Sequence, residues 1–251
     1  MMGDWLTKLF FALMMIKASD SVPLYGNSTL GYYYVKAFIG TPPQVQTMIF
    51  DTGSHLTLTV CEKCEKCGRH SFPKFSPTSS STCTKPTEWS MFQCSRYPDP
   101  ISKEKCAFSI SYIEGSSYHG YFVEDEFSLE DSEDWGRVVF GCITKETGLF
   151  YTQEAEGIIG IASNPFEEGE RPPNPLETAI INGKTNHNRF FLCISPNGGV
   201  LNFEDWNYSR HTNGKIQRLQ SSSVLFSTQY RIVVSGLMVG GYEINFNWKN
   251  L

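Results

Sequence analysis

The sequence predicts a mainly β protein, with one complete lobe followed by part of a second. Short runs of β-branched and aromatic residues recur along the chain, separated by glycine and proline turns. Only one segment has clear start and stop signals for a helix, and no repeat of solenoid length occurs. With 251 residues, 40% of them hydrophobic, the chain can bury one large core or two smaller ones.

The first predicted elements are a strand, a turn and a second strand. Aromatic and β-branched residues predict strands at 32–39 and 45–50, and Gly40-Thr41-Pro42-Pro43 predicts the turn between them. A short apolar run follows at 56–60. Residues 69–100 are rich in serine, threonine, proline and lysine, so we expect a loop there, held by cysteines.

The rest of the chain continues mainly as strands. A hairpin is predicted from residues 107–112 and 118–129, because Glu-Gly-Ser-Ser between them is typical of a turn. The helix is predicted at 175–182, where Asn174 can act as N-cap, proline takes the first position and Gly183 provides a stop. The remaining predicted strands are 138–143, 158–162, 190–195, 200–203 and 230–239.

The charge balance argues against a nucleic-acid partner. The formal net charge is -5 and the sequence pI is about 5.6, so we expect no basic face for nucleic acid or an anionic membrane surface. The acidic residues Asp125, Glu126 and those at 130–134 are expected along a solvated hairpin edge.

The N-terminal residues favour a secretory signal. The run 9–16 is apolar and is followed by small and polar residues from Ala18, which predicts a cleaved signal peptide at 1–20. A buried N-terminal helix or strand is the alternative. The run is too short to span a bilayer. We therefore expect a protein of the secretory pathway or the extracellular space.

Eight cysteines indicate disulfides before metal in that compartment. Zinc bound by Cys61, Cys64, Cys67 and His70 is the alternative. The pairing cannot be read from the sequence. The disulfide candidates are Cys61, Cys64, Cys67, Cys83, Cys94, Cys106 and Cys142.

The motif with the clearest chemistry begins at Asp51, directly after the apolar residues 48–50. A carboxylate there costs desolvation unless hydrogen bonds or a shared proton stabilise it. Two carboxylates about 3 Å apart share one proton and can activate a water. Thr52 can supply a hydroxyl behind the site, Gly53 permits close backbone approach, and Ser54 can donate to the outer carboxylate oxygen.

From about residue 31 to residue 244, the chain resembles the pepsin-like aspartic proteases. Residues 39–54 look like the family's entry to its first catalytic loop. Residues 156–162 look like the apolar segment that passes beside this loop, with Gly160 as its glycine. The resemblance implies the acid protease fold.

Residues 110–120 are similar to the flap hairpin of that family, whose tyrosine closes over the substrate. The resemblance assigns that role to Tyr112. It also implies an aspartic-type endopeptidase that acts on polypeptides without a cofactor or metal, with Asp51 as its catalytic carboxylate. Active-site support falls on Thr52, Gly53 and Ser54.

Within the family, the cysteine cluster and Phe140-Gly141-Cys142 resemble the nepenthesin-like branch, which includes the plasmepsin V type of protease. That branch inserts a disulfide-bonded loop soon after the catalytic loop. Leu58 departs from pepsin, which carries a tryptophan there that holds the flap tyrosine. Leu58 therefore cannot hold Tyr112 as that tryptophan does.

A single-chain enzyme of this kind needs a second motif, either Asp-Thr-Gly or Asp-Ser-Gly. Besides the motif at Asp51, this sequence contains no Asp-Thr-Gly and no Asp-Ser-Gly. Residues 230–244 resemble the strand pair that precedes the second aspartate. We therefore expect an N-terminal lobe at 21–203, with a Cys-rich insert at 61–106, and a partial C-terminal lobe at 204–251.

This departure leaves several readings of the function. We expect the isolated chain to be an inactive aspartic-type endopeptidase, either as a fragment that lacks its C-terminal lobe or as a natural short form. Two alternatives are a non-catalytic binding or regulatory lobe and a homodimer that pairs two copies of Asp51. Cys193 is expected to lack its partner.

Overall fold

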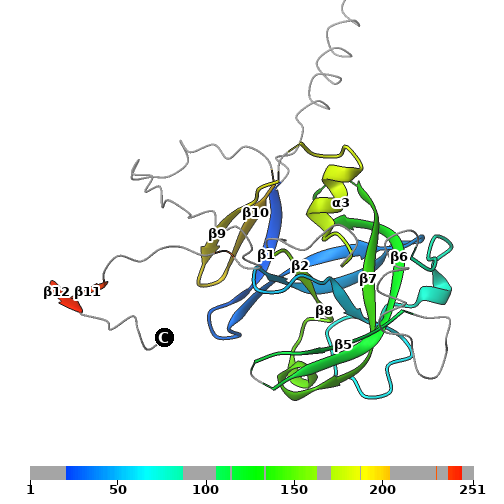
Figure 1. Ribbon diagram of the computed structural model, residues 1–251, viewed down its shortest axis with the longest axis horizontal. Helices are drawn as coiled ribbons and strands as arrows, with labels where there is room; N and C mark the ends of the chain where they lie inside the picture. Colours follow the sequence, from blue (N-terminus) through cyan, green and yellow to red (C-terminus); the bar gives the residue numbers. More distant parts are fainter. Residues whose placement is uncertain are drawn as a thin grey trace, which may run out of the picture.

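The computed structural model describes residues 21–86, 106–113, 115–132, 134–162, 171–186, 188–203, 230 and 237–244. These residues form a ten-stranded sheet, a two-stranded sheet, one α-helix and two 3₁₀ turns (Figure 1). The predicted mainly β fold class is confirmed. The predicted signal peptide and most of residues 204–251 lie outside the described residues.

The large sheet contains β1 (Ser21–Asn27), β2 (Tyr32–Ile39), β3 (Gln44–Asp51), β4 (Leu58–Val60), β5 (Ala107–Ser111), β6 (Ser117–Leu129), β7 (Asp134–Thr147), β8 (Gly157–Gly160), β9 (Phe191–Ser195) and β10 (Gly198–Asn202). Its strand order is β5-β6-β7-β4-β8-β3-β2-β1-β10-β9, and β6 also pairs with β2. The strands β2, β3, β8, β4, β7 and β6 therefore close into a ring.

The remaining elements are α3 (Pro175–Ile181), the 3₁₀ turns η1 (Pro77–Ser79) and η2 (Gly148–Thr152), and the sheet of β11 (Leu237–Val239) with β12 (Tyr242–Ile244). Of the predicted strand 230–239, only Tyr230 and β11 belong to the described residues. Among those described residues, no helix is long and apolar enough to cross a membrane.

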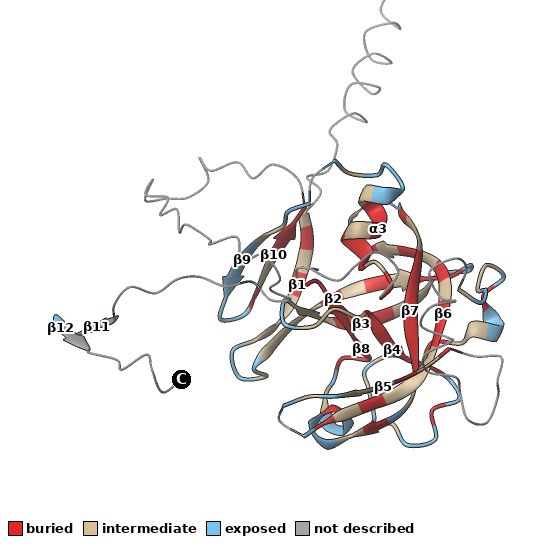
Figure 2. Cartoon of the chain, in the orientation of Figure 1, coloured by how far each residue is buried: buried red, intermediate tan, exposed pale blue. Residues whose placement is uncertain are grey.

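The core lies on both faces of the ring strands, because the adjacent β7 residues Val138 and Val139 belong to different apolar clusters. Along β2, Val35, Ala37 and Ile39 are buried and alternate with partly exposed residues, as expected for a strand with one face on a core. Figure 2 shows buried residues concentrated along β4, β7 and β8. The buried residues form two apolar clusters, one around Phe140 and the other around Leu58.

The predicted helix is confirmed as α3. The Asn174 side chain accepts from the Glu177 backbone N–H at 3.0 Å, and the Glu177 side chain accepts from the Asn174 N–H at 2.8 Å. This capping box satisfies donors that the first turn would otherwise leave unpaired. At the other end, Gly183 has φ +67, which favours glycine directly after a helix.

Strand β1 was not predicted, because Pro23 and Gly26 are unusual in a strand. Residues 21–24 pair only with β10, and the pairing with β2 begins at Tyr25. The backbone at Pro23 therefore pairs with one neighbouring strand only, so its missing N–H leaves no second strand without a partner. Strand β7 is longer than the predicted 138–143, because pairing with β6 extends over its polar ends as well.

The expected solvated position of Asp125 is wrong. This residue is fully buried, and its Oδ1 accepts from Thr82 Oγ1 at 2.6 Å and from the Glu126 N–H at 2.9 Å. The loop at 80–84 covers this part of β6, since Thr84 also pairs with Glu124. Loop coverage by a segment about 40 residues away in sequence is not visible in a local charge pattern.

Candidate active site

The loop that begins at Asp51 is held by strand β8. Strands β3 and β8 run parallel, and Asp51 is the register partner of Gly160. The Ile161 N–H donates to the Asp51 carbonyl at 2.9 Å, and the Ala162 N–H donates to the Ser54 carbonyl at 2.9 Å. The structure therefore brings the 156–162 segment beside the Asp51 loop.

Gly160 makes this close approach possible. A Cβ atom at this position would lie 2.6 Å from the Leu56 nitrogen and 2.7 Å from the Ser54 carbonyl oxygen. Both atoms belong to the backbone, so they cannot move aside as the end of a flexible side chain could. A residue with a side chain would have to displace the loop that follows Asp51.

The Asp51 carboxylate accepts a hydrogen bond from the Gly53 N–H, with a distance of 2.8 Å to Oδ1. The predicted hydrogen bond from Ser54 to the Asp51 carboxylate is absent. Ser54 Oγ is buried and makes no hydrogen bond in this structure. Thr52 is exposed, and the support expected from its hydroxyl stays a prediction. The backbone of Gly53 supplies the support expected from a side chain.

A cavity of about 260 Å³ opens beside Asp51. Asp51 is the only acidic residue among the described residues that line it. The other lining residues are Leu24, Gly31, Tyr32, Tyr33, Ile49, Phe50, Leu192 and Ile194. An apolar cavity with one carboxylate at its wall can hold an apolar group of a ligand next to that carboxylate.

Tyr112 lies at the end of β5, in the turn that leads into β6. Its N–H donates to the Ser116 carbonyl at 2.9 Å, and the Gly115 N–H donates to the Tyr112 carbonyl at 3.0 Å. The predicted hairpin is therefore present. Tyr112 and Ile49 both pack against the apolar cluster that contains Leu58. The hairpin and the strand leading to Asp51 thus share one core.

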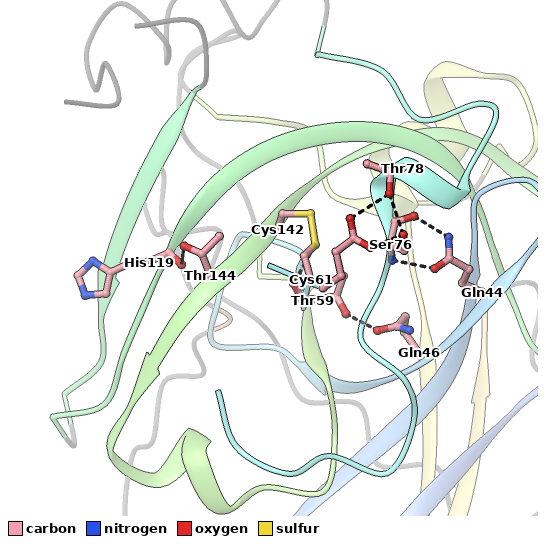
Figure 3. Close-up of a disulfide and its surroundings, with 10 residues drawn as sticks. Gln44, Gln46, Thr59, Cys61, Ser76, Thr78, His119, Cys142 and Thr144 are labelled. Atoms are coloured by element: carbon pink, nitrogen blue, oxygen red, sulfur yellow. Dashed lines mark hydrogen bonds between the residues drawn. A yellow bond between two sulfur atoms is a disulfide. The ribbon is translucent and has the colours of Figure 1, made fainter. Parts of the chain in front are cut away.

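Disulfides tie the Cys-rich insert to the sheet. Cys61 pairs with Cys142 of β7, with a Cα–Cα distance of 5.3 Å, and the bond lies near the hydrogen bond between Thr59 and Gln46 (Figure 3). Cys64 pairs with Cys67. Cys106 is also disulfide-bonded, and Cys94 lies outside the described residues.

The inclusion of Cys83 among the disulfide candidates is wrong, because Cys83 is a free, half-buried thiol. Burial and the negative charge of Asp125 raise the pKa of this thiol to about 11, although Arg137 acts in the opposite direction. Cys193 is also free, as predicted, and is exposed on β9.

The zinc alternative is wrong as well. The three sulfur atoms that it requires are all in disulfides. The fourth predicted ligand, His70, places its Nε2 atom 3.2 Å from Glu146 Oε2. Within the described part of the chain, no group of three or more histidine, cysteine or acidic residues is arranged to hold a metal.

Glu156 is a buried residue that organises the site, and no motif in the sequence predicted this role. Its Oε2 accepts from the N–H and the hydroxyl of Thr47, each at 2.6 Å, and its Oε1 accepts from the Phe72 N–H at 2.6 Å. Glu156 therefore joins β3, the start of β8 and the Cys-rich insert. An acidic residue directly before the apolar run 157–161 was the available signal.

The Asp51 loop, the hairpin that carries Tyr112 and the β8 segment together define a pepsin-like aspartic protease lobe. A family model described as xylanase inhibitor N-terminal matches residues 33–203. This match covers more than half of the chain, and the chain belongs to that family.

Curated relatives place the chain near the predicted branch. Aspartic protease 5 of Toxoplasma gondii is 35% identical over 200 residues, which cover 71% of this chain and 20% of the relative. Plasmepsin V of Plasmodium falciparum is 27% identical over 187 residues, covering 71% of this chain and 30% of the relative. Aspartic proteinase nepenthesin-2 of Nepenthes gracilis is 32% identical over 157 residues, which cover 62% of this chain and 34% of the relative.

The chain spans between a fifth and about half of the length of the first such relatives. Their names identify them as aspartic proteases, which supports a peptidase by family. The resemblance to the nepenthesin and plasmepsin V branch is confirmed.

Proposed function

We propose that this chain supplies one half of an aspartic-type endopeptidase, with Asp51 as one of the two carboxylates that activate a water against a peptide bond. The observation that carries this proposal is the register of Asp51 with Gly160, which places the carboxylate on a backbone-supported loop. The cavity beside Asp51 offers room for an apolar side chain of a polypeptide substrate.

The reaction requires a second carboxylate, because the pair must hold one proton between them. One carboxylate then takes a proton from the attacking water while the protonated partner donates to the carbonyl oxygen. This sequence contains one Asp-Thr-Gly motif and no Asp-Ser-Gly motif. The polypeptide of 251 residues is therefore inactive by itself, and a C-terminal lobe provides the second aspartate.

A reconstitution assay tests this proposal. The chain alone should not cleave fluorogenic peptides in the acidic range. Joined to a C-terminal lobe with its own Asp-Thr-Gly or Asp-Ser-Gly, it should cleave them, and a statine-type transition-state mimic should inhibit the reaction. Asp51→Asn should reduce that activity by at least about 10³-fold.

Asp131→Asn is the matched control. Asp131 is an exposed aspartate at φ 58, a conformation that asparagine tolerates. This variant should keep full activity. Activity that survives Asp51→Asn would refute the proposed role of Asp51. Statine-sensitive activity in the 251-residue chain, together with sedimentation as a dimer, would instead support two copies of Asp51 acting as a pair.

A non-catalytic binding lobe is the second candidate function. The description of the matching family model, xylanase inhibitor N-terminal, favours it, since that description refers to an inhibitor and not to a protease. In this case Asp51→Asn should leave binding of the partner unchanged. A loss of binding in Asp51→Asn, with the fold intact, would contradict this candidate.

We also place the protein in the secretory pathway or the extracellular space. Two described disulfides support this, because disulfides persist mainly in oxidising compartments. Translation with microsomes should remove residues 1–20 and protect the product from added protease. A product of full length that the protease digests would contradict this localisation.

A further inference from the structure

Three aromatic rings meet next to the turn of the hairpin that carries Tyr112. Phe150 of η2 stacks on Tyr118, with ring centroids 3.8 Å apart and planes at 12°. The Tyr112 ring meets Phe150 edge-on at 5.0 Å and 79°, and meets Tyr118 at 6.0 Å and 89°. Phe150 and Tyr118 are buried. We refer to these three residues as the flap ring cluster.

The segment that carries Phe150 is held on the hairpin side. The Leu149 N–H donates to Ser116 Oγ at 2.9 Å, and the hydroxyls of Ser117 and Thr147 lie 2.8 Å apart. Both contacts come from residues just before Phe150 in the sequence. They fix η2 against the turn between β5 and β6, so the ring of Phe150 cannot move far from Tyr112.

The same segment is held on the opposite side by the Cys-rich insert. Gly68 lies so close to the Tyr151 carbonyl that a Cβ at Gly68 would overlap this oxygen. His70 Nδ1 lies 3.0 Å from the Gln153 carbonyl, and the Ser71 N–H donates to the Glu154 carbonyl at 3.1 Å. Segment 148–154 is thus enclosed between the insert and the hairpin.

We propose that Phe150 is the positioning residue for Tyr112, supported from behind by the Cys-rich insert. Edge-to-face contact gives an aromatic ring a preferred orientation as well as buried area. Leu58, which is fully buried in the same apolar cluster, has no ring face to offer. The stacked rings of Phe150 and Tyr118 provide that surface instead. This proposal rests on the proposed function, because it assigns Phe150 a role through the flap tyrosine.

A simpler role for Phe150 is to fill space in the core. Phe108 allows the two roles to be separated. Phe108 is also a buried phenylalanine of the cluster around Leu58, and its ring pairs with Phe122 at 5.0 Å. Loss of either phenylalanine ring should lower stability, whereas only loss of Phe150 should change the environment of Tyr112.

The test uses the chain of 251 residues with 3-fluorotyrosine incorporated at position 112. Fluorine NMR reports the environment of this ring, and hydrogen exchange reports the N–H groups of Tyr112 and Gly115. Phe150→Leu should move the fluorine resonance toward its unfolded position and speed both exchanges by about tenfold. Phe150→Tyr, which keeps the ring, should restore both signals to within about twofold of the wild type.

Phe108→Leu is the matched control and should leave both signals at Tyr112 near their wild-type values. Equal effects of Phe108→Leu and Phe150→Leu would overturn the proposal, as would an unchanged Tyr112 signal in Phe150→Leu. If Phe150→Leu does not fold, Phe150→Met retains much of the volume without a ring and takes its place.

These measurements do not require catalysis, so their outcome is separate from the reconstitution assay. A failed assay with the expected Tyr112 signals would remove the proposed function and leave Phe150 as the residue that orders the hairpin. A successful assay with unchanged Tyr112 signals would remove only the role of Phe150.

Discussion

His70 and Glu146 form a buried ion pair that joins the Cys-rich insert to β7. His70 Nε2 lies 3.2 Å from Glu146 Oε2, and the two side chains are 2% and 1% exposed. The same carboxylate oxygen accepts from the Gly68 N–H at 2.9 Å. Segments separated by 76 residues therefore meet at one carboxylate, and the pair holds the insert next to η2.

The His70–Glu146 pair predicts a stability that falls as pH rises. Burial opposes the charged ring, but the hydrogen bond and charge of Glu146, the Gln153 carbonyl and the charge of Glu156 together outweigh it, so the pKa of His70 is raised above 6.5. When the pKa is higher in the folded state, protonation stabilises the fold. This stabilisation is fully present below the unfolded-state pKa and is lost as pH rises through the folded-state pKa. Urea unfolding from about pH 5 to about pH 9 measures this.

The comparison uses His70→Gln. The difference in unfolding free energy between wild type and His70→Gln should be largest at acidic pH and should shrink as pH rises. Glu146→Gln removes the partner and should abolish most of the same pH dependence. A difference that grows toward alkaline pH would show that His70 is held in its neutral form.

Gly160→Ala should destabilise the protein strongly. The added Cβ would meet backbone atoms of Leu56 and Ser54, so the Asp51 loop would have to shift, at a cost of about 3 kcal/mol. The neighbouring Ile159→Val removes one buried methylene and should cost about 1 kcal/mol. Urea midpoints compare the two variants, and equal costs would mean that the loop adapts to the new atom.

The two described disulfides should contribute unequally to stability. Cys61–Cys142 closes a separation of 81 residues, and its loss should cost about 4.5 kcal/mol through the added freedom of the unfolded chain. Cys64–Cys67 closes a separation of 3 residues, so the same argument gives about 2 kcal/mol. Paired alanine variants, compared by urea unfolding, measure both costs. A larger cost for the shorter link would refute the chain-entropy explanation.

The free thiols should differ in reactivity. Burial and Asp125 raise the pKa of Cys83 to about 11, so little thiolate is present near neutral pH, whereas Cys193 is exposed. Iodoacetamide should therefore modify Cys193 well before Cys83 in the folded protein, as read by peptide mass spectrometry. In denaturant the two rates should become similar. Faster labelling of Cys83 in the native protein would contradict its buried position.

Much of the fold was readable from short stretches of sequence. The alternation of Val35, Ala37 and Ile39 requires only the period of a strand, and the cap at Asn174 requires only residues of the first helical turn. The motif at Asp51 was likewise visible because its residues are adjacent. Strand β1 was missed, since whether Pro23 is tolerated depends on how many neighbours pair with it.

The sequence by itself thus determined the strand pattern, the helix caps and the position of the acidic motif, because neighbouring residues decide these features. Only the tertiary structure decided that Cys83 stays free, that Asp125 is buried and that the Asp51 carboxylate is supported by Gly53. It also brought Phe150 to Tyr112. Each of these outcomes depends on distances between atoms after the strands have paired. The order of neighbouring residues in the sequence does not determine those distances.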